Sequence, residues 1–302
     1  MAIARLCRLP KQELLATVGS ANFFNYYNFR TCETYYLFIY INCIEKMKTV
    51  IVGAGNVATH IAKTLAAHNC APVQIWSRHA DTAAVLAREV GSKAVARFED
   101  IDTDADVYII SVADQALEGV IKDLCRCCKQ GVFVHTAGTM SMDLFEGECN
   151  HYGVLYPMQT FSKDKALDFK KVPCFVEASD QMAYETIMQL ANTLSDNVHR
   201  LEGKDRKWLH VAAVFACNFA NACYTMAERI LREHGLDFDV MLPLVDETTA
   251  KLHSMSPVEA QTGPAARNDH NVMNRHMDML KDNADMQAVY RMMSEIIMNS
   301  KK

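Results

Sequence analysis

Residues 48–60 read KTVIVGAGNVATH, and this stretch decides the fold of the chain. Thr49–Val52 is a short β-branched apolar run, which is the pattern of a buried parallel strand. It leads into GAGNVA at residues 53–58, which has the spacing GxGxxA, and then into an amphipathic run that reaches Ala67. A strand, a glycine-rich turn and a helix in this order predict a dinucleotide-binding unit. The alternative is a glycine-rich turn in an α/β unit that binds nothing.

The small residues of this turn suit a bound dinucleotide. Gly53 permits a tight turn, Gly55 lets a pyrophosphate approach the backbone, and Ala58 lets the helix pack close to the strand. The helix N-terminus then offers free N–H groups and the positive end of its dipole to the phosphates. We therefore predict that the cofactor binds at Gly53, Gly55, Asn56 and Val57.

The end of the second predicted strand, Pro72–Ser77, indicates which cofactor binds. NAD-selective domains usually place Asp or Glu here, about 20 residues beyond the glycines, to hold the ribose 2′-hydroxyl. This chain has Ser77 and Arg78 instead, and no carboxylate that would repel a 2′-phosphate. The pattern favours NADP over NAD, although NAD remains possible. The alternative is that Arg78 is a solvated residue at the start of a helix.

Further strands and helices alternate up to residue 201. Strands are predicted at Asp106–Val112 (the fourth), Gly131–His135, Gly153–Tyr156, Cys174–Glu177 and Asn197–Leu201, and helices at Thr82–Val90, Gln115–Cys128 and Gln181–Leu194. This order predicts an α/β fold, a Rossmann doubly wound and mostly parallel sheet over residues 47–201. An all-α domain is predicted for residues 202–302.

The strand ends supply further candidate site residues, because ligands of open parallel sheets lie at the carboxyl ends of the strands. Val112 ends the fourth strand and Ala113 follows it; they lie in Ser111–Gln115, which we expect to flank the nicotinamide half of the cofactor. His135 ends the fifth strand, Thr136 begins its exit loop, and both are candidates near a substrate. A histidine that ends a strand is still more often structural.

Composition excludes several classes of function. The chain has 302 residues, which suggests two domains, and its net charge of −5 gives no reason to expect nucleic acid or an anionic membrane as a partner. Its 11 cysteines show no secretory framework, so we predict reduced thiols in a cytoplasmic protein. The cysteines of CRCC at residues 125–128 lie on a predicted helix and point different ways, so we predict no metal site.

Residues 1–46 differ from the rest of the chain. They are rich in Tyr, Phe and Asn, and their apolar run Tyr35–Ile44 is shorter than the roughly 20 residues that span a bilayer. No small-residue cleavage site follows that run, so a signal peptide is not expected. We predict an N-terminal extension outside the fold, with Met47 as the natural start. The alternative is a packing arm or a targeting segment.

One long helix dominates the second domain. Lys207–Arg232 contains no Gly or Pro, and Trp208–Met226 is apolar almost all round, which predicts a central buried helix. At about 100° per residue, its polar exceptions fall in one arc of roughly 80°; they are Lys207, His210, Asn218, Asn221 and Thr225. Hydrogen bonds between helices, or contacts across a dimer interface, would give the polar side chains of this arc their hydrogen-bond partners. A cleft that faces the cofactor would satisfy it equally well.

Helices are also predicted at Asp237–Leu252, from Pro257, from His270 and at Asp285–Met298. Ser256 and Asp269 are the expected N-caps of the second and third of these. The segment TGPAARND at residues 262–269 places Arg267 on a loop between helices, where it suits a carboxylate or phosphate. The alternative is that Arg267 pairs with Asp269 or with a helix end.

Five segments carry a resemblance to a known family: GAGNVA, HTAG, YPMQTF, KWLHVAAVFACN and TGPAARND, in this order. From Met47 to the end, the chain resembles a bacterial family that joins a Rossmann-like domain to a C-terminal helical domain of unknown function. More distantly, it is similar to pyrroline-5-carboxylate reductases, ketopantoate reductases, deazaflavin-dependent NADP reductases and β-hydroxyacid dehydrogenases. In those families an NAD(P) domain is followed by a helical domain like that of 6-phosphogluconate dehydrogenase.

The resemblance implies an NADP-dependent oxidoreductase that reduces a small anionic carbonyl or imine compound in an interdomain cleft. Lys207 or His210 would be the proton donor, Asn218 the orienting hydrogen-bond partner and Arg267 the anion clamp. β-Hydroxyacid dehydrogenases and ketopantoate reductases place a Lys and an Asn about one turn apart, whereas here three turns separate Lys207 from Asn218. This departure motivates the alternative of a dinucleotide-binding sensor or scaffold without turnover. A homodimer is expected in either case.

Overall fold

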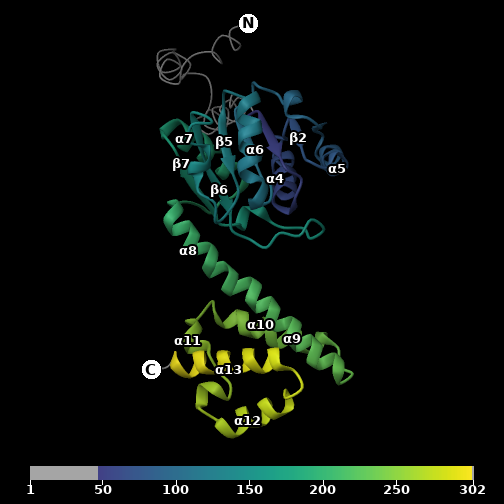
Figure 1. The fold of residues 1–302 in the computed structure, drawn as a ribbon, viewed down its shortest axis with the longest axis vertical. Coiled ribbons are helices and arrows are strands. Elements are labelled where there is room, and N and C mark those ends of the chain that lie inside the picture. Colours follow the sequence, from purple (N-terminus) through teal and green to yellow (C-terminus); the bar gives the residue numbers. More distant parts are fainter. Residues whose placement is uncertain (1–46, 301–302) are drawn as a thin grey trace, which may run out of the picture. The chain divides into compact units, whose positions relative to one another are not determined.

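The computed structural model describes residues 47–300, so the expectations for residues 1–46 lie outside the described residues. The chain divides into two compact units, one that ends at Val211 and one that begins at Ala212 (Figure 1). We call residues 47–211 the sheet unit and residues 212–300 the helical unit, and each is described by itself.

The sheet unit contains eight strands in the order β3-β2-β1-β4-β5-β6-β7-β8. The strands span Thr49–Val52 (β1), Gln74–Trp76 (β2), Lys93–Val95 (β3), Val107–Ile110 (β4), Val132–His135 (β5), His151–Pro157 (β6), Cys174–Ala178 (β7) and Val198–Arg200 (β8). Neighbouring strands are parallel except β6 and β7, which are antiparallel. This sheet confirms the predicted fold class.

Helices connect the strands as the sequence predicts. They span Asn56–Ala67 (α4), Ala80–Val90 (α5), Asp114–Cys127 (α6) and Gln181–Leu194 (α7), and short 3-10 helices lie at Phe98–Asp100, Met142–Phe145 and Phe169–Lys171. The sequence did not locate β3, because Lys93 and Ala94 are exposed and the strand has no apolar run.

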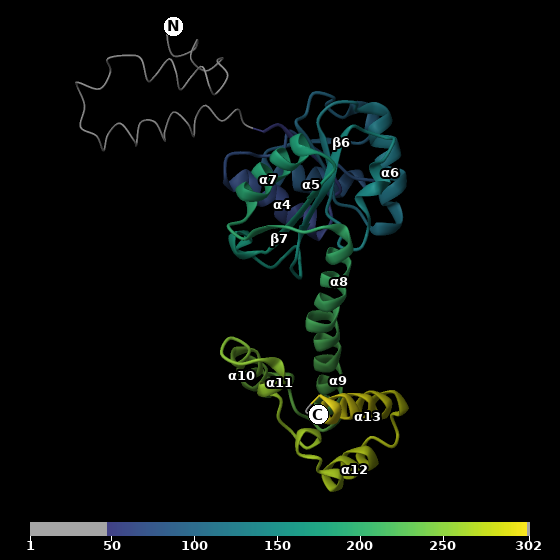
Figure 2. The ribbon, with the colours of Figure 1, turned by 90° about the vertical axis from the view of Figure 1, so that its left-hand side faces the viewer.

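The core forms two layers, one on each face of the sheet. Ile51 of β1 packs with the layer under α4, α5 and α7, whereas its neighbours Val50 and Val52 belong to the layer under α6. Figure 2 shows α6 on the opposite side of the sheet from α4 and α7. Alternate residues of a strand point to opposite faces, so a strand covered on both faces is apolar throughout. This explains why β4 is a continuous apolar run and why β1 and β5 are apolar except for Thr49 and His135.

The parallel strands also produce one functional edge. Because β2, β1, β4, β5 and β6 are parallel neighbours, their carboxyl ends follow one another along the same edge of the sheet. Adjacent strands lie about 5 Å apart, so this edge is a short row of loops. The loops of the row begin at Ser77, Gly53, Ser111, Thr136 and Met158.

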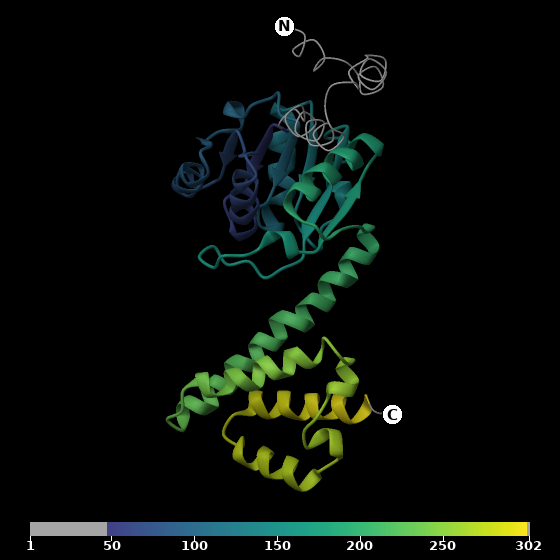
Figure 3. The same cartoon turned by 180° about the vertical axis from the view of Figure 1, so that it is seen from behind.

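α8 spans Gly203–Ala213 and begins in the sheet unit. The helical unit contains a π-helix at Val214–Phe219, α9 (Ala220–Glu233), α10 (Leu242–Lys251), α11 (Pro257–Ala260), α12 (His270–Met279) and α13 (Ala284–Asn299), with 3-10 helices at Phe238–Met241 and Ala265–Arg267 (Figure 3, green to yellow). Ser256 caps α11 in a capping box with Glu259, and Asp269 accepts a hydrogen bond from the Val272 N–H of α12. Both predicted N-caps are therefore confirmed.

The chain is helical throughout Lys207–Arg232, so the prediction of one long helix is confirmed, but two predictions about its faces are wrong. Six residues from Val214 to Phe219 are π-helical, which no Gly or Pro marks. The regular step of 100° per residue fails there, so the predicted single polar arc does not continue from His210 to Asn218.

The predicted burial of Trp208–Met226 is also absent in the described chain, where Trp208 is 75% exposed and Phe215 is 65% exposed. The physical reason is that the other helices of a single chain do not pack over most side chains of Trp208–Met226. Among the helices between residues 47 and 300, none combines the length and the hydrophobicity that a bilayer-spanning helix requires. Nor does any group of three or more His, Cys, Asp or Glu in that range lie close enough to hold a metal ion.

Candidate functional site

The glycine turn after β1 fits a bound pyrophosphate. Gly53 has φ of +127°, and a Cβ at this position would fall on the carbonyl group of Ser111, so only glycine is tolerated. Gly55 has an ordinary φ of −79° and a Cβ there would meet no atom within 4 Å, so glycine leaves open space in front of α4. The first turn of α4 has no acidic residue and no side-chain cap. Its N–H groups therefore face a space that suits an anion.

The two polar residues of this turn are placed differently. The Asn56 side-chain amide donates to the Phe161 carbonyl at 2.8 Å, so its side chain holds the loop that follows β6. The backbone N–H groups of Asn56 and Val57 remain the groups suited to phosphate. His60 of α4 hydrogen-bonds to the Ser162 carbonyl at 2.9 Å and fixes the same loop.

The exit from β2 carries the predicted selector of the 2′-phosphate. The Ser77 hydroxyl accepts from the His79 N–H at 3.3 Å and hydrogen-bonds with the Thr82 hydroxyl at 3.2 Å. Arg78 is exposed and has no ion pair with any described residue. Its guanidinium is therefore free for an anionic ligand.

The exits from β4 and β5 are tied together. The Thr136 hydroxyl donates to the Ser111 hydroxyl at 3.1 Å, and the Thr139 hydroxyl donates to Asp114 at 2.8 Å. Val112 and Ala113 lie between these two contacts, and Ala113 is exposed at the N-terminus of α6. The arrangement leaves Val112 and Ala113 at the functional edge, where the nicotinamide half was predicted.

His135 has a structural role. Its side chain is fully buried, its Nδ1 accepts from the Ala137 N–H at 3.2 Å, and its Nε2–H donates to the Ser141 carbonyl at 3.3 Å. Burial, together with the nearby Arg206 cation, lowers the pKa of His135 to about 3. The ring is therefore neutral and shapes the loop after β5, so the structure supports the structural alternative for this residue.

Arg206 of α8 is the largest fully buried side chain of the chain's described part. Its Nη1 donates to the carbonyls of Ala137 and Gly138, both at 2.9 Å, and its Nη2 pairs with Glu177 at 3.0 Å. The second oxygen of Glu177 accepts from the Gly203 N–H at 2.7 Å, at the start of α8. This buried ion pair joins the β5 exit, β7 and the first turns of α8.

The same anchoring brings His210 to the functional edge. Tyr156, near the end of β6, has its hydroxyl 3.1 Å from Nδ1 of His210. A Cβ on Gly138 would come within 2.5 Å of that Nδ1 and 3.0 Å of the Tyr156 ring. Gly138 is therefore required by close packing, and three segments distant in sequence converge at this point. Lys207, one turn earlier on α8, is exposed and has no ion pair with a described residue.

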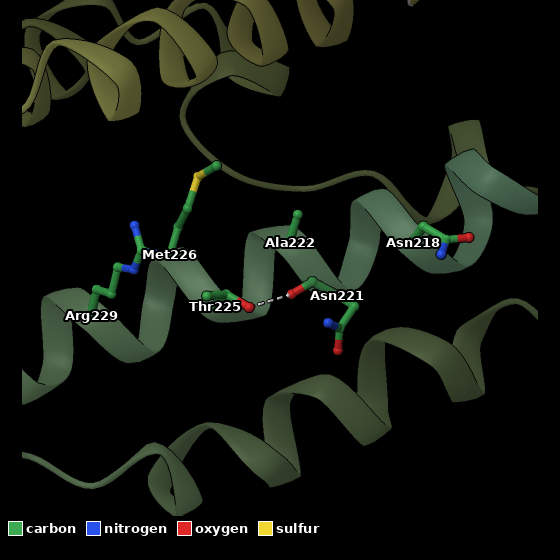
Figure 4. Close-up of a pocket in the computed structure, with 6 residues that line it drawn as sticks. All are labelled: Asn218, Asn221, Ala222, Thr225, Met226 and Arg229. Atoms are coloured by element: carbon green, nitrogen blue, oxygen red, sulfur yellow. Dashed lines mark hydrogen bonds between the residues drawn. The ribbon is translucent and has the colours of Figure 1, made fainter. Parts of the chain in front are cut away.

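The remaining polar residues of the predicted arc lie in the helical unit. Asn218, Asn221 and Thr225 line an open groove of about 330 Å³ along one helix (Figure 4). The Thr225 hydroxyl donates to the Asn221 carbonyl at 3.1 Å. The groove continues to Arg229, which the sequence analysis did not include.

Arg267 ends a 3-10 helix and is exposed. No ion pair joins it to Asp269 or to any other residue in the range 47–300, and the Asp269 carboxylate caps α12 instead. The alternative in which Arg267 pairs with Asp269 is therefore not what the structure shows. Its proposed role as an anion clamp stays a prediction.

Arg206 and Glu177 were not predicted from the sequence, and Tyr156 was given no role there. Arg206 lies outside the polar arc, and its partner Glu177 is 29 positions away in the chain. The two residues form no motif that could be recognised in the sequence, because the pair forms only when the fold brings β7 and α8 together. Tyr156 ends a predicted strand, which was a usable signal for a group at the functional edge.

Two family models match the chain. Residues 48–137 match the family described as NADP oxidoreductase, coenzyme F420-dependent, and residues 172–297 match a domain of unknown function, DUF2520. No curated protein matches the sequence. The two matched segments follow the predicted order of a nucleotide-binding domain and a helical domain.

Solved structures share the fold. A candidate NADP oxidoreductase from Bacteroides fragilis is 41% identical, with a TM-score of 0.80 over 84% of this chain and 98% of that one. A protein from Thermotoga maritima is 21% identical, with a TM-score of 0.64 over 83% and 97% of the two chains. An imine reductase from Myxococcus stipitatus in complex with NADP+ is 12% identical, with a TM-score of 0.60 over 84% and 93%. The last two are similar in fold alone.

Proposed function

The chain belongs to the oxidoreductase family that joins an NADP-binding Rossmann domain to the C-terminal domain DUF2520, and from this premise we propose that it reduces a small anionic carbonyl or imine compound with NADPH. In this proposal residues 47–201 form the dinucleotide-binding domain and residues 202–302 the substrate and dimerisation domain. Residues 1–46 are proposed to be an extension outside the fold.

The cofactor residues follow the order of the strands along the functional edge. Ser77 and Arg78 would bind the 2′-phosphate beside β2, and the N–H groups around Gly55 would bind the pyrophosphate beside β1. Val112 and Ala113 would flank the nicotinamide half beside β4. When bound, NADPH supplies the hydride that reduces the carbonyl or imine carbon.

The single observation that carries the proposal is the position of His210. It lies beside β5 and β6, the next strands along the edge after β4, and it is hydrogen-bonded to Tyr156 there. A reduction needs one proton for the oxygen or nitrogen atom, and a histidine N–H whose ring is hydrogen-bonded to a second proton donor can supply it. His210 is therefore the preferred proton donor, and Lys207 is the alternative. Asn218 is proposed to orient the substrate and Arg267 to bind its anionic group.

A dinucleotide-binding sensor or scaffold without turnover is the second candidate. The wide separation of Lys207 and Asn218 favours it, because the related dehydrogenases place these residue types one turn apart. The two functions differ in one measurable property, which is consumption of NADPH.

The test uses the purified full-length chain, a panel of keto acids, aldehydes and cyclic imines, and coenzyme F420, which the family description names. We expect NADPH to bind and to be oxidised with at least one anionic member of the panel. NADPH binding without oxidation by any member would favour the sensor.

Gly55→Val tests the cofactor site. The β-branched side chain would fill the space in front of α4, so NADPH affinity should fall about 100-fold or more, or about 2.7 kcal/mol. The matched control is Gly119→Val, at an exposed glycine of α6 with no atom within 4 Å of its Cβ position. Unchanged NADPH affinity in folded Gly55→Val would exclude this loop as the pyrophosphate site.

The proposal also includes a homodimer in the cytoplasm. The cysteines of the described residues are all free thiols, which supports a reducing compartment. Large apolar side chains that a single chain leaves exposed support a second copy, which would cover them.

A further inference from the structure

Tyr156 and His210 form a pair whose hydrogen-bond direction can be derived. Tyr156 is 8% exposed, and Nδ1 of His210 is its hydroxyl's hydrogen-bond partner among residues 47–300. If Nδ1 carried the proton and donated it, the buried phenol O–H would lack an acceptor. Leaving a buried donor unpaired is unfavourable, so the phenol donates and Nδ1 accepts.

The surroundings keep Tyr156 in its protonated form. Burial raises the pKa of the Tyr156 hydroxyl, and the Arg206 cation opposes this only in part. The charged group that acts on Tyr156 is the Arg206 guanidinium, which is itself paired with Glu177 at 3.0 Å. Tyr156 is therefore a donor throughout the range in which a histidine titrates.

A neutral imidazole that accepts at Nδ1 carries its proton at Nε2. Nε2 of His210 has no hydrogen-bond partner in the described part of the chain, and the side chain is half-buried. Gly138 and Tyr156 occupy the Nδ1 side of the ring. The free, proton-bearing nitrogen is thus the one that a substrate could reach.

We propose that Tyr156 is a positioning residue that holds His210 in the Nε2–H form, and that this Nε2 proton is the one delivered to the substrate. The inference rests on the proposed reductase function and adds to it the identity of the donor atom and of the residue that selects it. In the step, the Nε2–H bond breaks as a new O–H or N–H bond forms on the reduced substrate. As that bond breaks, the phenol proton of Tyr156 passes to Nδ1, so the imidazole stays neutral. The phenolate, which the Arg206 cation stabilises, then recovers a proton from solvent, while the hydride comes from NADPH.

Gly138 and Arg206 are the structural supports of this arrangement. The Arg206 guanidinium holds the Gly138 carbonyl at 2.9 Å, and the absent side chain of Gly138 leaves room for Nδ1. Gly138→Ala would push the imidazole away from Tyr156. It should therefore reproduce the defect of Tyr156→Phe although both polar partners are intact.

The first measurement is the tautomer of His210, by ¹⁵N NMR of the full-length chain with labelled histidine. The His210 signal is assigned by its loss in His210→Gln. We expect mainly the Nε2–H form in the wild type and an increased Nδ1–H fraction in Tyr156→Phe. The control is Tyr152→Phe, on the same strand, whose ring stacks on Phe145 and whose hydroxyl makes no hydrogen bond to a described residue. An unchanged tautomer in Tyr156→Phe would overturn the proposal.

The second measurement is turnover with the substrate found in the panel. His210→Gln should lower kcat about 100-fold, as expected for loss of a general acid, and Tyr156→Phe about tenfold, with the KM for NADPH unchanged in both. A shifted tautomer with unchanged kcat would overturn proton delivery from Nε2. If the wild type consumes no NADPH with any substrate, the reductase function fails, and the tautomer measurement still decides the positioning role of Tyr156.

Discussion

The sheet unit and the helical unit differ in how much apolar surface each buries. In the sheet unit, both faces of the sheet are covered, and residues such as Ile51, Ile109 and Phe133 are completely or almost completely buried. In the helical unit, the buried apolar side chains are Leu231, Ala265, Met273 and Met286. Both units contain several α-helices, so secondary structure alone does not make a stable unit.

The helical unit lacks a covering for many of its large apolar side chains, which are exposed in a single chain. They include Phe215, Phe219, Ile230, Leu242, Leu244, Met279, Met292 and Ile296. Ordering each residue costs about 1–2 kcal/mol of conformational entropy, which a unit with so small a core does not offset. The comparison therefore suggests that the sheet unit is stable by itself, whereas the helical unit needs the second copy that we propose.

The largest expected effect is loss of the dimer. Phe215 and Phe219 are exposed and pack edge to face, with ring centroids 4.9 Å apart. We expect sedimentation of the wild type to give the mass of two chains, and Phe215→Asp with Phe219→Asp to give the mass of one. Hydrogen exchange should then accelerate in the helical unit and stay slow in the sheet unit.

Val85→Asp is the matched control for the dimer, because Val85 is an exposed apolar residue of α5 in the sheet unit. It should leave the mass unchanged. A monomeric wild type with slow exchange throughout the helical unit would contradict the proposed difference between the two units.

The next effect concerns the stability of the sheet unit. Arg206→Met removes one partner of a buried ion pair and leaves one oxygen of Glu177 and two carbonyls without their donor. Such losses lower the free energy of unfolding by about 3–5 kcal/mol. Arg126→Met, at an exposed pair with Asp123, should cost about 1 kcal/mol or less. Equal effects in urea denaturation would show that burial of Arg206 does not matter.

His135 makes a contribution that depends on pH and, at pH 5 and above, is smaller than that of Arg206. Its pKa is about 3 in the folded chain, against about 6.5 when unfolded, so protons bind the unfolded state preferentially below pH 6.5. The stability of the sheet unit should be complete above pH 6.5 and should fall by about 1.4 kcal/mol per pH unit between 6.5 and 3. His135→Gln should show a shallower slope in urea denaturation at pH 7, 6 and 5. Parallel slopes would exclude His135 as the cause.

The smallest effect is on the preference for NADPH over NADH, which should depend on the sheet unit alone. Arg78→Ala should weaken NADPH binding about tenfold and leave NADH binding unchanged, because one exposed charge-assisted contact is lost. Calorimetry with both cofactors measures the ratio. If the ratio is the same in the variant, a residue other than Arg78 selects NADP.

Much of the sheet unit followed from local sequence. The β-branched run Thr49–Val52, the spacing GxGxxA and the alternating segments after it located most strands and helices to within about two residues. Caps such as Asp269 were equally clear. These features depend on neighbours in sequence, for which backbone conformation and side-chain period are sufficient.

The long helix shows where local reasoning fails. The interior of Lys207–Arg232 reads as apolar and unbroken, yet a π-helix interrupts it and its apolar residues are exposed in the described chain. Whether an apolar side chain is buried depends on what packs against it, and the helix's own sequence does not contain that information.

The sequence by itself determined the fold class, the glycine turn for the cofactor and the candidates His210 and Arg78. Only the tertiary structure decided that Arg206 pairs with Glu177, that His135 is buried and neutral, and that Tyr156 contacts His210 beside Gly138. The reason is physical. A buried charge or a directed hydrogen bond needs a partner within about 3 Å, and here those partners come from strands and helices many positions apart.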